Sequence, residues 1–207
     1  LMHFHIEQYL NGCEIESPCS LEFEQILALH EGVIKEQQIP VRPELSVYSK
    51  GLNVAGQIDA IFKQADDTFV LWDWKRSKLL RYDSRSQMKE PLDHFPNVNA
   101  WHYFLQLSIH RHILQEDYGV PVSAMYLGVF HPTRSQPLCV RVPLMDDEME
   151  LLFGVSLVER LSCANVHFFN IYLFSCVFDH LPSQGSMVKG AGYRVLFLQS
   201  VFTWVNE

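Results

Sequence analysis

Residues 56–75, with the sequence GQIDAIFKQADDTFVLWDWK, place two aspartates inside otherwise apolar stretches. Val, Ile, Phe, Leu and Trp flank these two aspartates, and an Ala-Asp-Asp run divides the segment, which predicts strands at 53–62 and 68–75 joined by a turn. Asp59 lies in the first strand and Asp73 in the second. Aspartate is depleted in strands, and a charge inside an apolar run needs a partner or a metal ion. Both carboxylates can therefore reach one metal site, given antiparallel strands that splay or bulge there.

Lys75 follows Asp73 by two positions, so the two side chains lie on the same face of the second strand. A carboxylate binds hard divalent cations. A neighbouring lysine can orient or polarise an attacking water, or stabilise a pentacovalent phosphate. The pair is thus suited to phosphodiester hydrolysis. The alternative is a structural ion pair at the edge of a sheet, because a D-x-K motif is too short to be specific.

Basic residues are concentrated in this segment and directly after it, where only Asp83 opposes them. They are Lys75, Arg76, Lys78, Arg81, Arg85 and Lys89. The whole chain carries a formal net charge of −8, which argues against a protein that coats nucleic acid non-specifically. One basic segment in an acidic protein predicts an anionic partner bound locally, with a solvated surface loop as the alternative.

The remainder of the first 153 residues alternates between helical and strand patterns. Helices are expected at 2–10, 21–37, 98–117 and 146–153, and further strands at 44–49, 122–130 and 138–143. Ser20 precedes two glutamates and suits a helix N-cap, whereas Pro40 and Pro43 follow the end of that helix. The order of the elements predicts an α/β or α+β fold with a central mixed β-sheet flanked by helices.

Composition divides the 207-residue chain near residue 153. One domain is expected over 1–153, and residues 154–207 form an apolar tail with only six charged side chains. Within the tail, the apolar stretch 164–178 includes polar residues that argue against a membrane span. No signal-sequence pattern follows Leu1, and the domain is expected to be truncated at its N-terminus. An odd number of cysteines, five, favours reduced thiols in an intracellular compartment, the nucleus or the cytoplasm.

Other chemical motifs are missing from the sequence. It has no phosphate-binding P-loop, no G-x-G-x-x-G and no G-x-S-x-G, so no nucleotide cofactor is expected. The cysteines lack the close C-x-x-C spacing of an iron–sulfur or zinc site. Two H-x-H pairs, which begin at His3 and His110, are expected on helices, where positions i and i+2 point apart.

The segments G-Q-I-D-A-I-F and V-L-W-D-W-K resemble the core of the PD-(D/E)XK nuclease superfamily, and the chain is most similar to its RecB-like branch, which includes lambda-type exonucleases. That branch carries a Q-x-x-x-Y motif on the helix after the D-x-K strand. Gln106 fits this motif, and His110 stands where tyrosine is usual. The branch also has a metal-binding histidine on an early helix, which L-M-H-F-H-I-E matches with His3, and His5 is the alternative. The resemblance covers residues 3–153 and implies a restriction-endonuclease-like core.

The resemblance also implies a role for each matching residue. The metal ligands would be His3, Asp59, Asp73 and the carbonyl of Trp74. The catalytic group would comprise Asp59, Asp73, Lys75, Gln106 and Glu44. The nucleic-acid contacts would be Arg76, Lys78, Arg81, Gln106 and His110.

The implied activity is that of a deoxyribonuclease dependent on Mg²⁺ or Mn²⁺, most similar to an exonuclease. Its substrate would be DNA, and its role would lie in repair, recombination or the processing of replication ends. Two alternatives remain from the sequence. One is a nuclease-fold module that binds DNA or acts as a scaffold without cutting it. The other is a structural domain in which Asp73 and Lys75 form only an ion pair.

Overall fold

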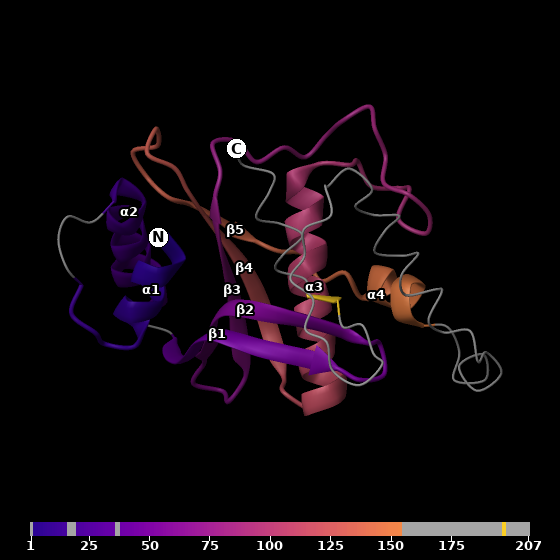
Figure 1. Cartoon of the computed structure of the whole chain (residues 1–207), viewed down its shortest axis with the longest axis horizontal. Helices are drawn as coiled ribbons and strands as arrows, with labels where there is room; N and C mark the ends of the chain where they lie inside the picture. Colours follow the sequence, from indigo (N-terminus) through magenta and orange to yellow (C-terminus); the bar gives the residue numbers. More distant parts are fainter. Residues whose placement is uncertain (1, 16–19, 36–37, 155–195, 198–207) are drawn as a thin grey trace.

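The computed structural model describes residues 2–15, 20–35, 38–154 and 196–197. Its helices are α1 (Met2–Leu10), α2 (Leu21–Leu29) with the π-helical turn η1 (His30–Ile34), α3 (Asn99–Tyr118) and α4 (Asp146–Phe153). Its strands are β1 (Ile39–Ser49), β2 (Val54–Lys63), β3 (Phe69–Arg76), β4 (Val122–Phe130), β5 (Leu138–Arg141) and the short β6 (Leu196–Phe197). Figure 1 shows their arrangement.

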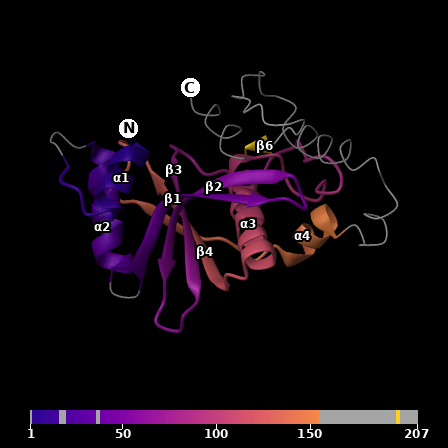
Figure 2. The ribbon, with the colours of Figure 1, turned by 60° about the horizontal axis from the view of Figure 1, so that its bottom comes forward.

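The strands form one mixed sheet in the order β1-β2-β3-β4-β5, with β6 paired to β2 outside this path. β3 and β4 are parallel, because α3 carries the chain back between them, and the other neighbours along the main path are antiparallel. Helices flank the sheet (Figure 2). This arrangement confirms the predicted α+β class with a central mixed sheet.

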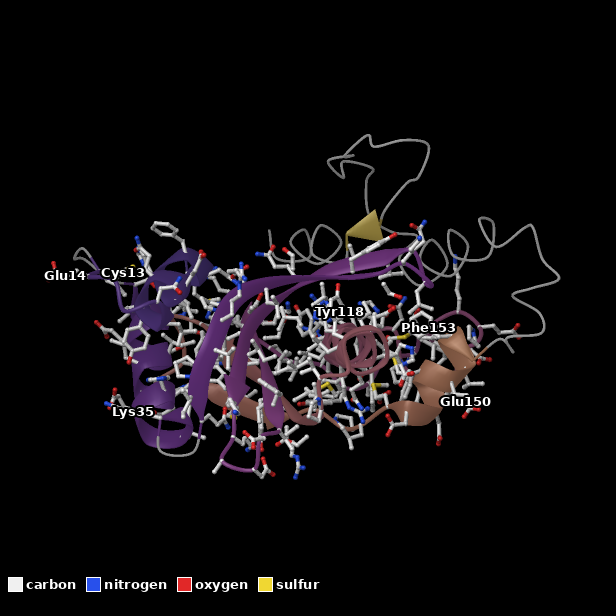
Figure 3. All side chains as sticks on the ribbon, turned by 90° about the horizontal axis from the view of Figure 1, so that it is seen from below. Cys13, Glu14, Lys35, Tyr118, Glu150 and Phe153 are labelled. Atoms are coloured by element: carbon white, nitrogen blue, oxygen red, sulfur yellow. The ribbon has the colours of Figure 1, made fainter. Side chains whose placement is uncertain are left out.

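The two faces of the sheet bury different apolar clusters. Alternate residues of β3 divide between them: Leu71 packs with α3, whereas Trp72 and Trp74 pack with α1 and α2. Side chains fill the space between the sheet and α3 (Figure 3). Because side chains alternate along a strand, Asp73 and Lys75 share the face of Leu71, toward α3. The fold thus places Asp73 and Lys75 on the α3 face, whereas Arg76, at the end of the strand, contacts Glu22 of α2.

Most predicted elements are present, with shifted ends. Ser20 caps α2 as expected, because its side chain accepts a hydrogen bond from the backbone N–H of Phe23. Gly119 ends α3 with a φ of 65°, a left-handed conformation that glycine adopts without steric cost.

The largest shift concerns β1, which begins at Ile39 rather than at residue 44. The strand runs through Pro40 and Pro43, which we expected to lie before it. An edge strand tolerates proline, because its outer side needs no ladder hydrogen bond. β1 is such an edge strand along the main path of the sheet.

The predicted boundary at residue 153 coincides with the end of α4. Apart from residue 154 and β6, the apolar tail lies outside the described residues, so the division into domain and tail stays a prediction. Among the described residues, no helix combines the length and the hydropathy needed to cross a bilayer.

Candidate metal centre and acid–lysine pair

Three side chains that can ligate a metal ion meet beside β2: His3 of α1, Glu44 of β1 and Asp59 of β2. Each offers one ligand atom, and these atoms all lie within 4.8 Å of one another. His3 Nδ1 is 3.5 Å from Asp59 Oδ2 and 3.9 Å from Glu44 Oε1. We call these three residues the ligand triad. An imidazole and two carboxylates are a donor set that can hold a divalent cation.

Glu44 reaches the triad from an uncommon backbone conformation. The register of β1 and β2 places it opposite Asp59. Its φ is 51°, in the left-handed region that residues with a Cβ atom disfavour. The side-chain amide of Gln57 donates a hydrogen bond to Glu44 Oε2. Such local strain is characteristic of functional sites, where the surrounding structure enforces it.

Asp59 connects the triad to β3. The ladder between β2 and β3 ends at Ala60, and the strands are not paired beyond that point. There the Asp59 Oδ2 atom accepts a hydrogen bond of 2.7 Å from the backbone N–H of Trp74. Asp59 is only 3% exposed, so this buried carboxylate needs its partners. The hydrogen bond fixes the triad against the backbone between Asp73 and Lys75.

Asp73 and Lys75 form a close ion pair, which we call the acid–lysine pair. Lys75 Nζ lies 3.0 Å from Asp73 Oδ1 and 2.7 Å from Asp73 Oδ2. Asp73 is 2% exposed. The ammonium group also lies 5.1 Å from the centre of the Tyr103 ring, a favourable cation–π distance. Asp73 is thus next to the triad and faces Lys75, and it is not one of the three triad members.

The charges of the triad shift the pKa values of its members. Burial lowers the pKa of His3, but the Asp59 carboxylate and the hydrogen bonds to Asp59 and Glu44 outweigh burial and raise it to about 10. Solvent screens part of this attraction, because 41% of the His3 side chain is exposed. For Asp59, burial acts to raise the pKa, but His3, Lys75 and the Trp74 N–H together hold it below its usual value. His3 is therefore protonated at pH 7 in the metal-free protein.

Asp73 shows the opposite balance. Burial raises its pKa, the ammonium of Lys75 lowers it, repulsion from Asp59 raises it again, and the result is about 6. Burial acts to lower the pKa of Lys75, but attraction to Asp73 and Asp59 raises it above its usual value. At pH 7 the carboxylates of Asp59 and Asp73 thus have protonated His3 and Lys75 as nearby counter-ions.

Gln106 and His110 lie one turn apart on the buried side of α3, with exposed fractions of 2% and 0%. Among the described residues, Gln106 Oε1 and both ring nitrogens of His110 have no hydrogen-bond partner. Burial lowers the pKa of His110 to about 4, so its ring is neutral at pH 7. Their predicted contact with nucleic acid gains no support from this burial and stays a prediction.

The three predicted cationic contacts differ from one another. Arg76 Nε lies 2.5 Å from a carboxylate oxygen of Glu22 on α2, so this cation has an internal partner. Lys78 and Arg81 are exposed in the segment after β3. Arg76 is exposed as well, with 54% of its side chain accessible, but its charge is offset by Glu22.

Sequence reasoning missed three contributors to the site. Gln57, which hydrogen-bonds to Glu44, lies inside the quoted G-Q-I-D motif, so its position was a usable signal. Glu22, which pairs with Arg76, is one of the two glutamates that follow Ser20, and the sequence suggests only an acidic first turn of a helix there. Tyr103, whose ring faces Lys75, lies on the helix that was predicted over residues 98–117. Neither of these two contacts has a signal in local sequence, because each joins elements far apart in the chain.

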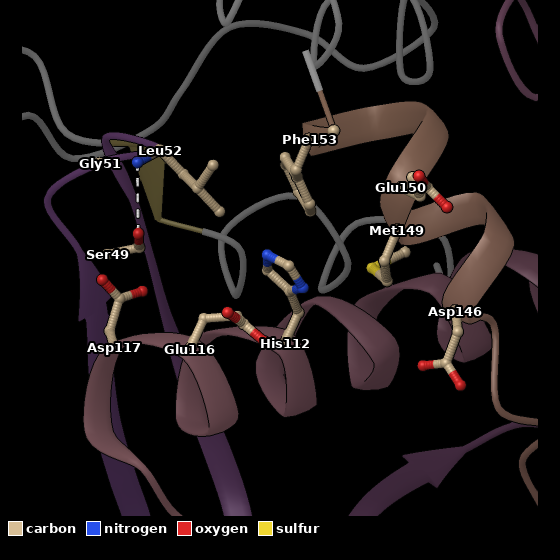
Figure 4. A pocket seen from close by; sticks show the side chains of 11 residues that line it. Ser49, Gly51, Leu52, His112, Glu116, Asp117, Asp146, Met149, Glu150 and Phe153 are labelled. Carbon is tan, nitrogen blue, oxygen red and sulfur yellow. Dashed lines mark hydrogen bonds between the residues drawn. The ribbon is translucent and has the colours of Figure 1, made fainter. Parts of the chain in front are cut away.

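A separate cavity of about 400 Å³ lies between the end of β1, α3 and α4, and shares no residue with the triad (Figure 4). Its lining includes Glu116, Asp117, Asp146 and Glu150. These carboxylates disfavour a phosphate-bearing ligand.

No family model matches the chain, and no curated protein matches it. Among solved structures, the chain is similar to the crystal structure of a candidate exonuclease from Eubacterium rectale, with 10% sequence identity and a TM-score of 0.44. The match covers 90% of this chain and 76% of that chain. A likeness at this level assigns neither a family nor an activity.

Proposed function

We propose that this protein is a divalent-metal-dependent deoxyribonuclease, and by its resemblance an exonuclease, that hydrolyses phosphodiester bonds. The observation that carries the proposal is the hydrogen bond from the Trp74 N–H to Asp59. It joins the ligand triad to the acid–lysine pair, so that a metal-binding group and a partly buried ammonium group adjoin. A metal ion and an ammonium group side by side can together stabilise the charge that develops on a phosphodiester during hydrolysis.

The triad residues His3, Glu44 and Asp59 would hold the ion, and the resemblance adds Asp73 and the Trp74 carbonyl as ligands. Mg²⁺ and Mn²⁺ suit the carboxylate-rich donor set. A bound ion of this kind polarises a phosphoryl oxygen and lowers the pKa of a coordinated water.

Lys75 would donate hydrogen bonds to the phosphate as negative charge develops on it. Asp73 holds the ammonium in place through both carboxylate oxygens. Ring contact with Tyr103 limits the directions in which the lysine can move. These contacts position the ammonium before substrate arrives, so that little reorganisation is needed during the reaction.

DNA is the substrate that we propose. Lys78 and Arg81 would contact its phosphates, because their side chains are exposed directly after β3. Arg76 would do so only after it leaves Glu22. A role in repair, recombination or the processing of replication ends follows from the family resemblance alone.

The test is cleavage of end-labelled single- and double-stranded DNA in Mg²⁺, in Mn²⁺ and in EDTA. Asp59→Asn and Lys75→Met should each lower the rate by about 100-fold or more, because Asp59 would hold the ion and Lys75 would stabilise the phosphate. Asp93→Asn and Lys50→Met are matched controls, since both residues are exposed and lie outside the triad and the acid–lysine pair. Cleavage that survives both site variants would contradict the proposal.

A nuclease-fold module that binds DNA without cutting it is the alternative. The ring of His110 favours this alternative, because it is neutral, has no hydrogen-bond partner within the described ranges and stands where the related branch has tyrosine. DNA binding that Mg²⁺ or Mn²⁺ strengthens, without any cleavage product, would support it.

A further inference from the structure

We infer that the segment after β3 binds single-stranded DNA, with a base stacked on Tyr82 and the neighbouring phosphates on Lys78 and Arg81. The inference rests on the proposed function for its choice of DNA, and it deepens that function by naming the form of the substrate. We call residues 78–82 the stacking segment. It leads from the end of β3 toward the loop that reaches α3 (Figure 1).

The stacking segment exposes two kinds of side chain. Lys78 and Arg81 are exposed cations, and no ion pair joins either to a carboxylate in the described part of the chain. Leu79 and Tyr82 are exposed apolar or aromatic side chains, 57% and 46% exposed. Leu80 alone is buried, at 7%, and anchors the segment to the core. Cations interleaved with exposed aromatic surface are the features that bind single strands.

Hydrogen bonds to α3 and its first turn hold the backbone of the segment. Asn99 makes two of them: its Oδ1 accepts from the Arg81 N–H at 2.9 Å, and its Nδ2 donates to the Leu79 carbonyl at 2.9 Å. The Trp101 indole donates to the Tyr82 carbonyl at 3.0 Å. A side chain on a backbone fixed in this way loses little freedom when a ligand binds, and this favours affinity.

The stacking segment lies close to the proposed reaction site through α3. The Tyr82 ring lies 6.2 Å from the Phe104 ring, and the adjacent residue, Tyr103, faces the Lys75 ammonium. Tyr82 and Lys75 are seven positions apart, so their Cα atoms can be separated by at most ~25 Å. One strand of nucleic acid can therefore contact both groups.

The exposed ring distinguishes single strands from duplex DNA. In a duplex both faces of each base are covered by its neighbours, so a surface aromatic ring stacks only on a base that is unpaired or at an end. Phosphate contacts from Lys78 and Arg81 act on both forms alike. We therefore expect Tyr82 to contribute to the binding of single strands and not of duplex.

Fluorescence anisotropy in EDTA tests this, with a labelled single strand and the duplex of the same sequence titrated against the full chain. Tyr82→Ala should weaken single-strand binding by about 5- to 150-fold, as expected for the loss of one base stack. It should change duplex binding by less than about twofold. Tyr82→Phe keeps the ring and should bind as the unmodified chain does. Tyr48→Ala is the matched control, because Tyr48 is an exposed tyrosine on β1, 38% exposed.

Arg81→Gln provides the electrostatic comparison. It should weaken both forms of DNA and reduce the slope of log affinity against log salt by about one. Equal losses for single strands and duplex in Tyr82→Ala, or no loss in either, would overturn the stacking inference. Binding is measured without metal, so the two proposals can fail separately. A chain that binds single strands through Tyr82 but cuts no DNA would refute the nuclease proposal and leave the stacking inference standing.

Discussion

Binding of a divalent ion to the ligand triad should release about one proton at pH 7. The reason is the charge state of His3, whose pKa near Asp59 is about 10. Its Nδ1 atom faces Asp59 and Glu44 and carries a proton in the metal-free protein. A metal ion requires the neutral imidazole, so the proton must leave.

The magnitude follows from the two pKa values of the site. Between pH 6.5 and pH 8, His3 is protonated, because its pKa is about 10, and Asp73 is mostly ionised, because its pKa is about 6. Ion affinity should then rise about tenfold per pH unit, or ~30-fold over this range. The attraction between protonated His3 and Asp59 also stabilises the metal-free fold. This contribution is fully present below pH 6.5 and is lost as the pH rises through 10.

Isothermal titration calorimetry with Mn²⁺ measures both quantities. At pH 7, the observed enthalpy in buffers of different ionisation enthalpy gives the number of protons released. His3→Gln should bind more weakly and release almost none. His5→Gln is the matched control, because it makes the same change two residues along α1 and outside the triad. An affinity that is constant between pH 6.5 and pH 8 would refute the reasoning, as would equal proton release from His3→Gln.

Three further predictions concern stability, measured by urea unfolding of the metal-free protein. His110→Leu should raise the free energy of unfolding by about 1–2 kcal/mol, because it removes two buried ring nitrogens without partners among the described residues. The gain should grow as the pH falls from 6.5 toward 4, because the unfolded wild-type histidine takes up a proton in this range and the folded one does not. A His110→Leu variant less stable than the wild type would show that the ring has a partner. Glu44→Gly should be about 1 kcal/mol more stable than Glu44→Ala, since the φ of 51° disfavours a Cβ atom, and equal stabilities would contradict this. Gly128→Ala should cost about 1–3 kcal/mol, because the new Cβ atom would lie 2.8 Å from the Trp74 ring, and an unchanged midpoint would mean that the ring moves freely.

The sequence predicted the elements better than it predicted their contacts. Alternating apolar residues around Asp59 and Asp73 identified two adjacent strands, because the period of a strand is visible in the local sequence. The position of β1 was wrong at its start, since proline in an edge strand resembles proline in a loop. Whether a strand lies at an edge depends on the whole sheet and is not encoded nearby.

The candidate site shows the same division. Asp59, Asp73 and Lys75 could be identified from spacing, and His3 and Glu44 could be named through a resemblance. The distances among them could not, because α1, β1 and β2 meet only in the folded chain. That Glu44 joins the triad while Asp73 faces Lys75 depends on the register of β1 and on how the β2–β3 ladder ends. Neither feature is visible in a single sequence.

The protonated side chains of His3 and Lys75 have a consequence for the order of folding and metal binding. They serve as built-in counter-ions for the carboxylates of the site. The apoprotein can therefore fold before it meets a metal ion, unlike small zinc domains, in which folding waits for the ligand. A chelator should therefore abolish activity without unfolding the protein, and the folded chain could release and rebind the ion repeatedly.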